Sequence, residues 1–206
     1  MRLVVGVMGP ATGDIDESVL DKSRRLGAAV ARAGCTLVTG ACPGVPQAAV
    51  LGAAAEGGLV VGISPALSEA EHVERFASPL EGFDVMIYTG SGLMGREVIN
   101  IRSSDIVVVA GGHSGTLGEF SIAYDEGRLI GVLTKTGGIA DIVAELVEKI
   151  DKDTGAVVLY DDDPESLISR LLERYEGDHA RLRKPAEWGG DAVVAARGDG
   201  SQAVAT

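Results

Sequence analysis

The sequence predicts an α/β fold with a doubly wound parallel sheet of about seven strands and helices on both faces. Short apolar runs rich in valine, isoleucine and leucine alternate along the chain with segments of helical periodicity, as in strand–helix–strand units. The composition points the same way, because 46% of the residues are hydrophobic, only 4% are aromatic and 29 are glycine. Such a core consists of aliphatic side chains, as in parallel strands that are buried on both faces.

The strand predictions rest on short apolar runs that are bounded by glycine or by polar residues. Helix-like segments separate these runs, so we expect the strands to lie parallel in a Rossmann-like sheet. The predicted strands are residues 3–8, 36–39, 59–63, 84–88, 106–110, 129–133 and 156–159.

The helix predictions rest on apolar spacing and on residues that favour helix ends. The first predicted helix carries apolar residues at helical spacing and ends at Gly34, and the last begins at Asp163-Pro164-Glu165, a favourable N-terminus. Residues 64–82 are irregular and polar, with room for one short helix. The predicted helices are residues 16–33, 47–56, 93–103, 117–126, 139–150 and 164–175.

The length and the change of composition near the C-terminus predict one domain and a tail. A chain of 206 residues suits a single domain of moderate size. Residues 176–206 carry glycine, alanine, aspartate and arginine without clear periodicity. We therefore expect a domain over residues 1–175 and a flexible C-terminal tail over residues 176–206.

Charge and cysteine content exclude several functional classes. The net charge of −12 argues against non-specific binding to nucleic acid or to anionic membranes, although a local site can still bind one small phosphate. Two cysteines and three scattered histidines provide neither a disulfide framework nor a spaced metal motif. We therefore expect no metal site. The apolar N-terminal run is too short for a signal peptide or a membrane span, so we expect a cytoplasmic protein.

Four glycine-rich segments follow predicted strands, at 9–14, 39–46, 89–96 and 111–119. Open α/β sheets bind their ligands at the carboxyl ends of the strands, so these segments are candidates for a binding cleft. Short glycine-rich connections also occur in α/β proteins without a ligand there, and this pattern alone leaves both interpretations open. On the ligand interpretation, Gly9, Thr12, Gly40 and Gly44 border a nucleoside.

The segment 111–119 combines a buried strand, a glycine-rich turn and a helix start. Backbone N–H groups at a helix N-terminus attract anions, and glycine allows the backbone to approach a phosphate closely. We expect the N–H groups of Gly112, Ser114, Gly115 and Thr116, together with the Thr116 hydroxyl, to bind phosphate. Glu119 ends the segment and would repel a phosphate unless it faced another part of the ligand.

These segments resemble the LOG family, whose members are often mislabelled lysine decarboxylases. Several members are cytokinin riboside 5′-monophosphate phosphoribohydrolases. The family pattern is an arginine in a helix, followed after the next strand by Pro-Gly-Gly-x-Gly-Thr-x-x-Glu. On this chain the pattern falls on Arg96, Thr116 and Glu119, and Thr39-Gly40-Ala41-Cys42-Pro43-Gly44-Val45 and Gly57-Gly58 add to the resemblance, which covers roughly residues 1–160.

The chain departs from this pattern at four positions. Gly111 stands for the motif proline, His113 for the second glycine and Gly118 for the first of the usual paired glutamates. Glu97 follows Arg96 where the family has lysine. The chain thus looks like a divergent branch, similar to molybdenum cofactor carrier proteins, which share the fold.

The decarboxylase label has no support, because pyridoxal chemistry needs a Schiff-base lysine in a pocket. Lys135 is the only lysine near a predicted strand end. We therefore expect no cofactor.

Each candidate side chain has a structural alternative. Thr116 and Glu119 also match a capping box, in which Thr116 would cap the helix and the Glu119 side chain would accept a hydrogen bond from the Thr116 N–H instead of facing a ribose. Arg96 either contacts an anionic ligand or forms a surface ion pair with Glu97 or another acid. Asn100 shares the face of Arg96 and either contacts a base or ribose or is a buried cap or interface amide. His113 either assists phosphate binding or faces solvent.

Two functions follow from the resemblance. The first is hydrolysis of the N-glycosidic bond of a nucleoside 5′-monophosphate, with Arg96 orienting the ribose phosphate and Glu119 driving the reaction. The second is non-catalytic carriage or sensing of a phosphate-bearing ligand such as the molybdenum cofactor. The resemblance also implies a homodimer or larger homo-oligomer, with the helices at 93–103 and 117–126 as candidate contacts.

Overall fold

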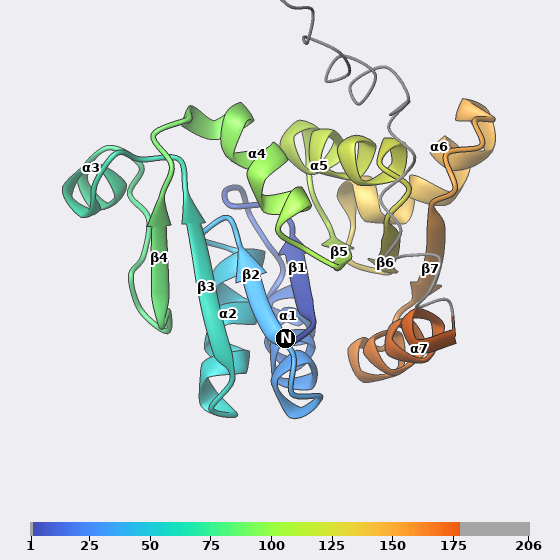
Figure 1. The fold of residues 1–206 in the computed structure, drawn as a ribbon, viewed down its shortest axis with the longest axis horizontal. Coiled ribbons are helices and arrows are strands. Elements are labelled where there is room, and N and C mark those ends of the chain that lie inside the picture. The colour runs from blue at the N-terminus through green and yellow to red at the C-terminus, as the bar shows by residue number, and fades with distance from the viewer. Residues whose placement is uncertain (1, 178–206) are drawn as a thin grey trace, which may run out of the picture.

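A computed structural model describes residues 2–177, which form a seven-stranded, fully parallel sheet with helices on both faces (Figure 1). This architecture confirms the predicted fold class. The strand order is β4-β3-β2-β1-β5-β6-β7. The strands are β1 (Val4–Met8), β2 (Thr36–Thr39), β3 (Leu59–Ser64), β4 (Val85–Tyr88), β5 (Ile106–Ala110), β6 (Leu129–Leu133) and β7 (Val157–Asp161).

The strand order contains one reversal, between β1 and β5. The chain runs outward from β1 through β2 and β3 to the edge strand β4, returns to pair β5 with β1, and then continues through β6 to β7. After β1 the chain continues to β2 on one side of this pair of strands, and after β5 it continues to β6 on the other side. A crevice is expected outside the carboxyl ends of these two strands.

Two groups of helices cover the two faces of the sheet (Figure 1). Helices α1, α2 and α7 pack on one face and α4, α5 and α6 on the other. The helices are α1 (Glu17–Arg32), α2 (Val45–Ala55), α3 (Glu69–Glu74), α4 (Gly92–Arg102), α5 (Ser114–Asp125), the 3₁₀ helix η1 (Gly138–Asp141), α6 (Val143–Ile150) and α7 (Pro164–Gly177).

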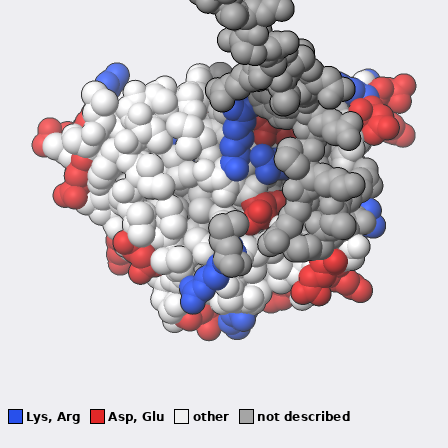
Figure 2. Space-filling view, in the orientation of Figure 1, with Lys and Arg blue, Asp and Glu red and all other residues white. Residues whose placement is uncertain are grey.

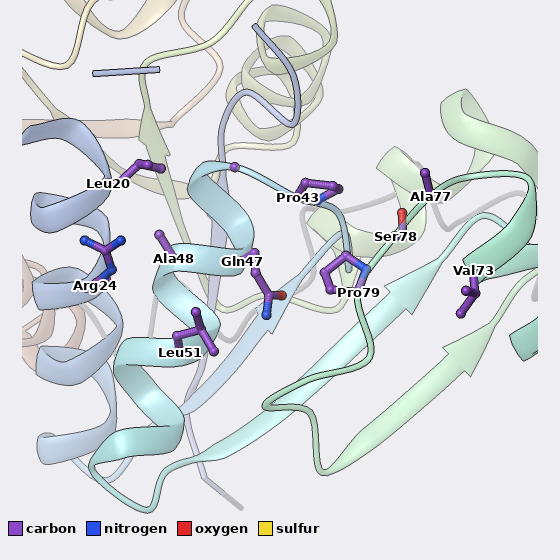
Figure 3. A pocket seen from close by; sticks show the side chains of 11 residues that line it. Leu20, Arg24, Pro43, Gln47, Ala48, Leu51, Val73, Ala77, Ser78 and Pro79 are labelled. Carbon is purple, nitrogen blue, oxygen red and sulfur yellow. The ribbon is translucent and has the colours of Figure 1, made fainter. Parts of the chain in front are cut away.

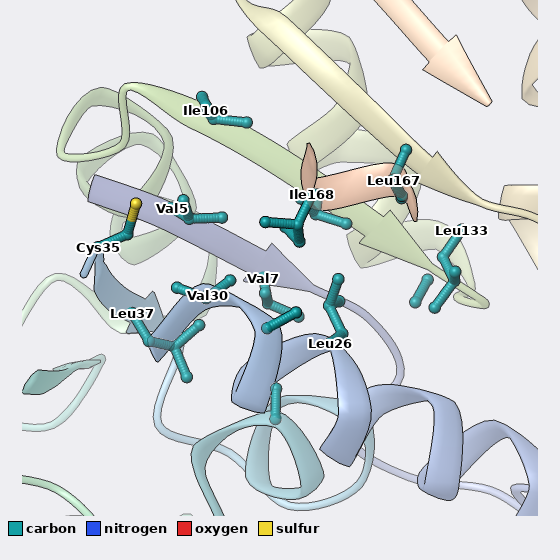
Figure 4. Packing of buried hydrophobic residues seen from close by; sticks show 14 of the residues in the cluster. Val5, Val7, Leu26, Val30, Cys35, Leu37, Ile106, Leu133, Leu167 and Ile168 are labelled. Atoms are coloured by element: carbon teal, nitrogen blue, oxygen red, sulfur yellow. The ribbon is translucent and has the colours of Figure 1, made fainter. Parts of the chain in front are cut away.

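The larger core lies under α1, α2 and α7 (Figure 4). Val5 and Val7 of β1 are fully buried there against Leu26 and Val30 of α1. On the other face, Phe120 of α5 is fully buried in the cluster that it forms with strands β1, β5 and β6. The strands are therefore buried on both sides, as the aliphatic composition predicted.

Some predicted boundaries were wrong. Helix α5 begins at Ser114 rather than at residue 117, because His113 is extended and the backbone becomes helical directly after it. The predicted helix 139–150 is divided into η1 and α6 at Ile142. The short helix allowed for within 64–82 is α3. Apart from residues 176 and 177, the predicted C-terminal tail lies outside the described residues.

An area with few charged side chains extends over the α4 face at the β4 edge, as the left half of Figure 2 shows. The strand register places Val85 and Ile87 on the same face of the sheet as Val107, which packs under α5. Helices α4 and α5 do not cover this edge, so Val85 is 46% exposed and Ile87 is 45% exposed. Leu93 and Met94, at the start of α4, are also exposed. We call these four residues the apolar face.

Within residues 2–177, no helix has the length and hydropathy that a membrane crossing requires.

Helices α1 and α2 pack with their backbones in close contact at two glycines. A Cβ atom on Gly27 would lie 1.8 Å from the carbonyl oxygen of Ala49, and one on Gly52 would lie 1.9 Å from the carbonyl oxygen of Arg24. Since backbone atoms cannot rotate away as side chains do, a methyl group at either position would force the two helices apart.

We expect Gly27→Ala and Gly52→Ala each to lower the free energy of unfolding by about 1–3 kcal/mol, because overpacking separates α1 from α2. Chemical denaturation monitored by circular dichroism measures this change. Gly177→Ala is the matched control, because no atom lies within 4 Å of the position that its Cβ would take. Equal stability of Gly27→Ala and the wild type would contradict the predicted contact.

Candidate functional site

A cavity of about 580 Å³ lies at the crevice between the carboxyl ends of β1, β5 and β6. Three segments line it: the loop after β1 with the start of α1, the turn between β5 and α5, and the loop after β6 with η1. Of the predicted site residues, Thr12, Gly112 and His113 line this cavity. The structure thus brings together residues from segments that are far apart in the sequence.

The turn between β5 and α5 has the backbone of an anion cradle. Gly111 and Gly112 have φ values of +60° and +105°, which favour glycine. The following helix begins at Ser114, so the N–H groups of Ser114, Gly115 and Thr116 in its first turn have no intrahelical acceptor. These groups point out of the helix start, where the helix dipole favours an anion.

The loop from β6 to η1 holds this turn in place. The Thr136 hydroxyl accepts a 2.8 Å hydrogen bond from the Gly111 N–H, and the Gly112 carbonyl accepts a 3.0 Å bond from the Ile139 N–H. A Cβ atom on Gly138 would lie 2.2 Å from the Gly112 carbonyl oxygen. Thr136 therefore supports the cradle, and no pattern in the sequence pointed to it.

His113 is exposed and lines the cavity. Its Cε1 atom lies 3.6 Å from the position that a Cβ on Gly13 would occupy, so the ring faces the loop after β1. The imidazole is therefore both open to solvent and adjacent to the cradle.

A buried group of polar side chains lies between α4, α5 and the loop after β2. Arg96 of α4 is 7% exposed and Glu119 of α5 is 6% exposed, and the Arg96 Nη1 atom lies 3.7 Å from Glu119 Oε1. The guanidinium lies directly over Gly40, because a Cβ there would be 1.6 Å from Arg96 Nη1. Only glycine fits at residue 40 while Arg96 keeps this position. The alternative of a surface ion pair for Arg96 is wrong in its location, because Arg96 does pair with an acid, Glu119, but both side chains are buried.

Burial raises the pKa of Glu119 to about 7. The Arg96 guanidinium and a hydrogen bond with Asn100 oppose this rise, whereas the negative charge of Glu97 adds to it. Near neutral pH both protonation states of Glu119 are populated, as suits a group that exchanges protons with a ligand.

Cys42 lies beside this pair, on the loop after β2. Burial raises the pKa of its thiol to about 11, although the charge of Arg96 partly opposes the effect. The thiol is therefore neutral at physiological pH and is not a nucleophile there.

Asn100 is fully buried, and its amide nitrogen lies 3.1 Å from the sulfur of Met8. The Asn100 Oδ1 and Arg96 Nε atoms are buried and have no hydrogen-bond partner among the described residues. Unpartnered buried polar atoms are costly, so this group retains capacity to bind further polar atoms.

The capping-box interpretation of Thr116 and Glu119 is wrong. The N-cap of α5 is His113, and Thr116 lies inside the first turn. Glu119 therefore lies one turn beyond the helix start, and its carboxyl faces Arg96 instead of the N-cap backbone. Glu119 therefore does not cap α5.

Gly9 and Gly44 serve the packing of the loops. A Cβ on Gly9 would lie 2.6 Å from the Ala110 carbonyl oxygen, and one on Gly44 would lie 2.3 Å from the Pro10 carbonyl oxygen. Both glycines let neighbouring loops approach beneath the crevice. Sequence analysis missed Glu97, Cys42 and Thr136; only Glu97, as the residue after Arg96, carried a visible signal.

A second cavity of about 570 Å³ lies between α1, α2 and the segment after α3 (Figure 3). Leu20, Leu51, Val73 and Pro79 make most of its wall apolar, and Gly44 is the one predicted site residue that lines it. The group around Arg96 lines neither this cavity nor the one at the crevice. Glu119 follows the anion cradle by about one turn of α5, and on that basis we assign the candidate site to the crevice together with this buried group.

The raised pKa of Glu119 has a consequence for stability. The folded state keeps a proton on Glu119 up to about pH 7, whereas the unfolded chain loses it near the ordinary value of 4.5. The folded state thus binds more protons between these values, and the contribution of Glu119 to stability falls as the pH rises through this range.

We expect Glu119→Gln to flatten the pH dependence of the free energy of unfolding between pH 4.5 and 7, by an amount on the order of 3 kcal/mol. Urea denaturation at a series of pH values measures it. Glu126→Gln is the control: despite partial burial, hydrogen bonds from Arg102 and Arg128 lower the pKa of Glu126, so it titrates below this range. Identical slopes for Glu119→Gln and the wild type would disprove the shift.

Comparison with known proteins agrees with the fold and with the resemblance to a LOG-like branch. An uncharacterized protein of Archaeoglobus fulgidus is 36% identical over 134 residues, or 65% of this chain and 82% of the relative. The X-ray structure of TM1055 matches with a TM-score of 0.72 and 25% identity, covering 84% of this chain and 99% of that chain. The molybdenum cofactor binding protein of Rippkaea orientalis matches with a TM-score of 0.69 and 27% identity, covering 84% and 98%. Residues 2–168 match the SLOG cluster4 family, and the chain belongs to this family.

Proposed function

We propose that this protein binds a nucleoside 5′-monophosphate and hydrolyses its N-glycosidic bond, which releases the free base and ribose 5-phosphate. One observation carries the proposal: a buried carboxyl group with a pKa of about 7 pairs with a buried arginine beside an open helix N-terminus. The helix start suits a phosphate, and the carboxyl group suits a sugar that becomes cationic.

The phosphate binds to the first turn of α5. The free N–H groups of Ser114, Gly115 and Thr116 and the Thr116 hydroxyl donate hydrogen bonds to it, with the Gly112 N–H at the turn. His113 stands at the same edge of the cavity, where its ring can donate a further hydrogen bond to the phosphate. Thr12, across the crevice, borders the nucleoside. Binding of the phosphate positions the glycosidic bond and thereby lowers the entropic part of the barrier.

Glu119 and Arg96 act on the ribose. The C1′–N bond breaks, its electron pair stays with the base, and positive charge develops on C1′ and the ring oxygen. Glu119 gives its proton to the base nitrogen, and the carboxylate so formed stabilises this cation and accepts a proton from the attacking water, while Arg96 orients the ribose phosphate. The pair separates when the ligand enters, and the unpartnered Arg96 Nε then has an acceptor.

We expect incubation with AMP to release adenine, detected by chromatography, and Glu119→Gln to slow the release by about 10²–10⁴-fold, because the variant lacks the ionisable carboxyl group. Glu126→Gln, at the other end of α5, should match the wild type. The proposal is wrong if wild-type protein releases no more base from AMP and other monophosphates than Glu119→Gln does.

A carrier function is the second candidate, favoured by the similarity to the molybdenum cofactor binding protein of Rippkaea orientalis. A phosphate-bearing ligand would use the same cradle without bond cleavage. In that case a pterin co-purifies with the protein, nucleotides raise the melting temperature without turnover, and Glu119→Gln leaves ligand affinity nearly intact.

We further propose that two copies of this chain associate through the apolar face (Figure 2). An isologous interface places the same surface on both subunits, so a surface without charge avoids facing like charges. Large exposed apolar patches commonly mark association sites. Helix α4 would link this interface to Arg96, because Met94 lies on its outer side and Arg96 on its inner side.

We expect the combined change Ile87→Lys and Met94→Lys to halve the molar mass of the protein in solution, because it places like charges on both sides of a desolvated interface. Size-exclusion chromatography with light scattering measures the mass. Ile142→Glu is the matched control, since Ile142 is also exposed but lies between η1 and α6. A wild-type mass equal to that of one chain would overturn this interface.

A further inference from the structure

A second buried carboxyl group, Glu97, adjoins the pair of Arg96 and Glu119. Glu97 lies on α4 directly after Arg96 and is 6% exposed. Its two carboxyl oxygens lie against α5: Oε1 is 3.5 Å from the position of a Cβ on Gly115, and Oε2 is 3.3 Å from that on Gly118. The absence of side chains at these two glycines leaves space for the carboxyl group between α4 and α5.

The buried group contains two acids and one base. Adjacent residues of a helix point in different directions, so the Arg96 guanidinium cannot pair equally well with its neighbour Glu97 and with Glu119. Within residues 2–177, the ion pair formed by Arg96 is the one with Glu119. If both acids were ionised, the group would carry a net negative charge in a buried environment, which is unfavourable.

Among residues 2–177, the other titratable groups nearby do not supply a second positive charge. Cys42, on the loop after β2, is a neutral thiol. His113 precedes the first turn of α5, but its ring faces Gly13 across the crevice. The remaining way to lower the charge is for the two carboxyl groups to share one proton.

We propose that Glu97 is a positioning residue, which keeps one proton on the Glu97–Glu119 pair so that Glu119 can deliver it to the departing base. This inference rests on the proposed hydrolysis. Burial raises the pKa of Glu97, with Arg96 opposing, and the charge of Glu97 raises the pKa of Glu119.

The proton balance of the reaction is then complete. The C1′–N bond breaks, its electron pair goes to the base nitrogen, and the Glu119 proton protonates that nitrogen. The oxygen of water bonds to C1′, and one water proton returns to the carboxylate pair. The acid is thus regenerated with each turnover.

Glu97→Gln tests the inference, because it removes the charge and preserves the shape. We expect Glu119 to lose its proton at a pH about one unit lower in this variant, since the neighbouring negative charge is gone. The alkaline limb of the pH profile of kcat/KM for AMP should move to lower pH by the same amount. Relative to the wild type, kcat/KM should then be about tenfold lower at pH 8 and little changed at pH 5.5. Infrared difference spectroscopy follows the Glu119 carboxylic acid band, identified by its loss in Glu119→Gln.

The control variants separate structure from charge. Glu97→Met, which removes the charge with a side chain of similar volume, should give the same two shifts, and it replaces Glu97→Gln if the latter does not fold. Glu126→Gln should shift neither. If the wild type hydrolyses AMP but neither Glu97 variant shifts the band or the limb, this inference alone is overturned. If the wild type does not hydrolyse any monophosphate, the proposed function and the proton delivery both fail.

Discussion

The pairing of Arg96 with Glu119, at 3.7 Å and with both side chains buried, is the interaction around which the site is organised. A buried charge without a partner is strongly destabilising, so each of these residues constrains the other. The pair connects α4 to α5, and the guanidinium fits only because residue 40 is glycine. Three elements at the carboxyl edge of the sheet are thereby tied to one another.

The site separates two kinds of charge over a short distance. The start of α5 presents free N–H groups to the crevice, whereas the next turn carries the Glu119 carboxyl group. A ligand with a phosphate and a sugar that becomes cationic matches this arrangement. The overall charge of −12 does not oppose such a ligand, because the local dipole and the nearby Arg96 act at much shorter range than the global field.

The departures from the LOG pattern become understandable in the structure. Gly118 removes a glutamate from α5, but the Oε2 atom of Glu97 lies 3.3 Å from the position of the missing Cβ. A carboxyl group therefore remains between the two helices, although it comes from α4. A glutamate at residue 118 would compete with Glu97 for this space, so glycine at 118 suits the carboxyl group at 97.

The spacing within a motif made Arg96 and Glu119 candidate site residues. The fold class and the strands followed from the sequence alone, because they depend on local periodicity. The sequence alone did not predict the burial of the Arg96–Glu119 pair, the raised pKa of Glu119 or the support from Thr136. These features arise from contacts between segments far apart in the chain, such as residue 40 with 96 and residue 111 with 136. The start of α5 also depended on tertiary structure, since Gly115 and Gly118, which appear unfavourable for a helix, lie within it where Glu97 of α4 packs against α5.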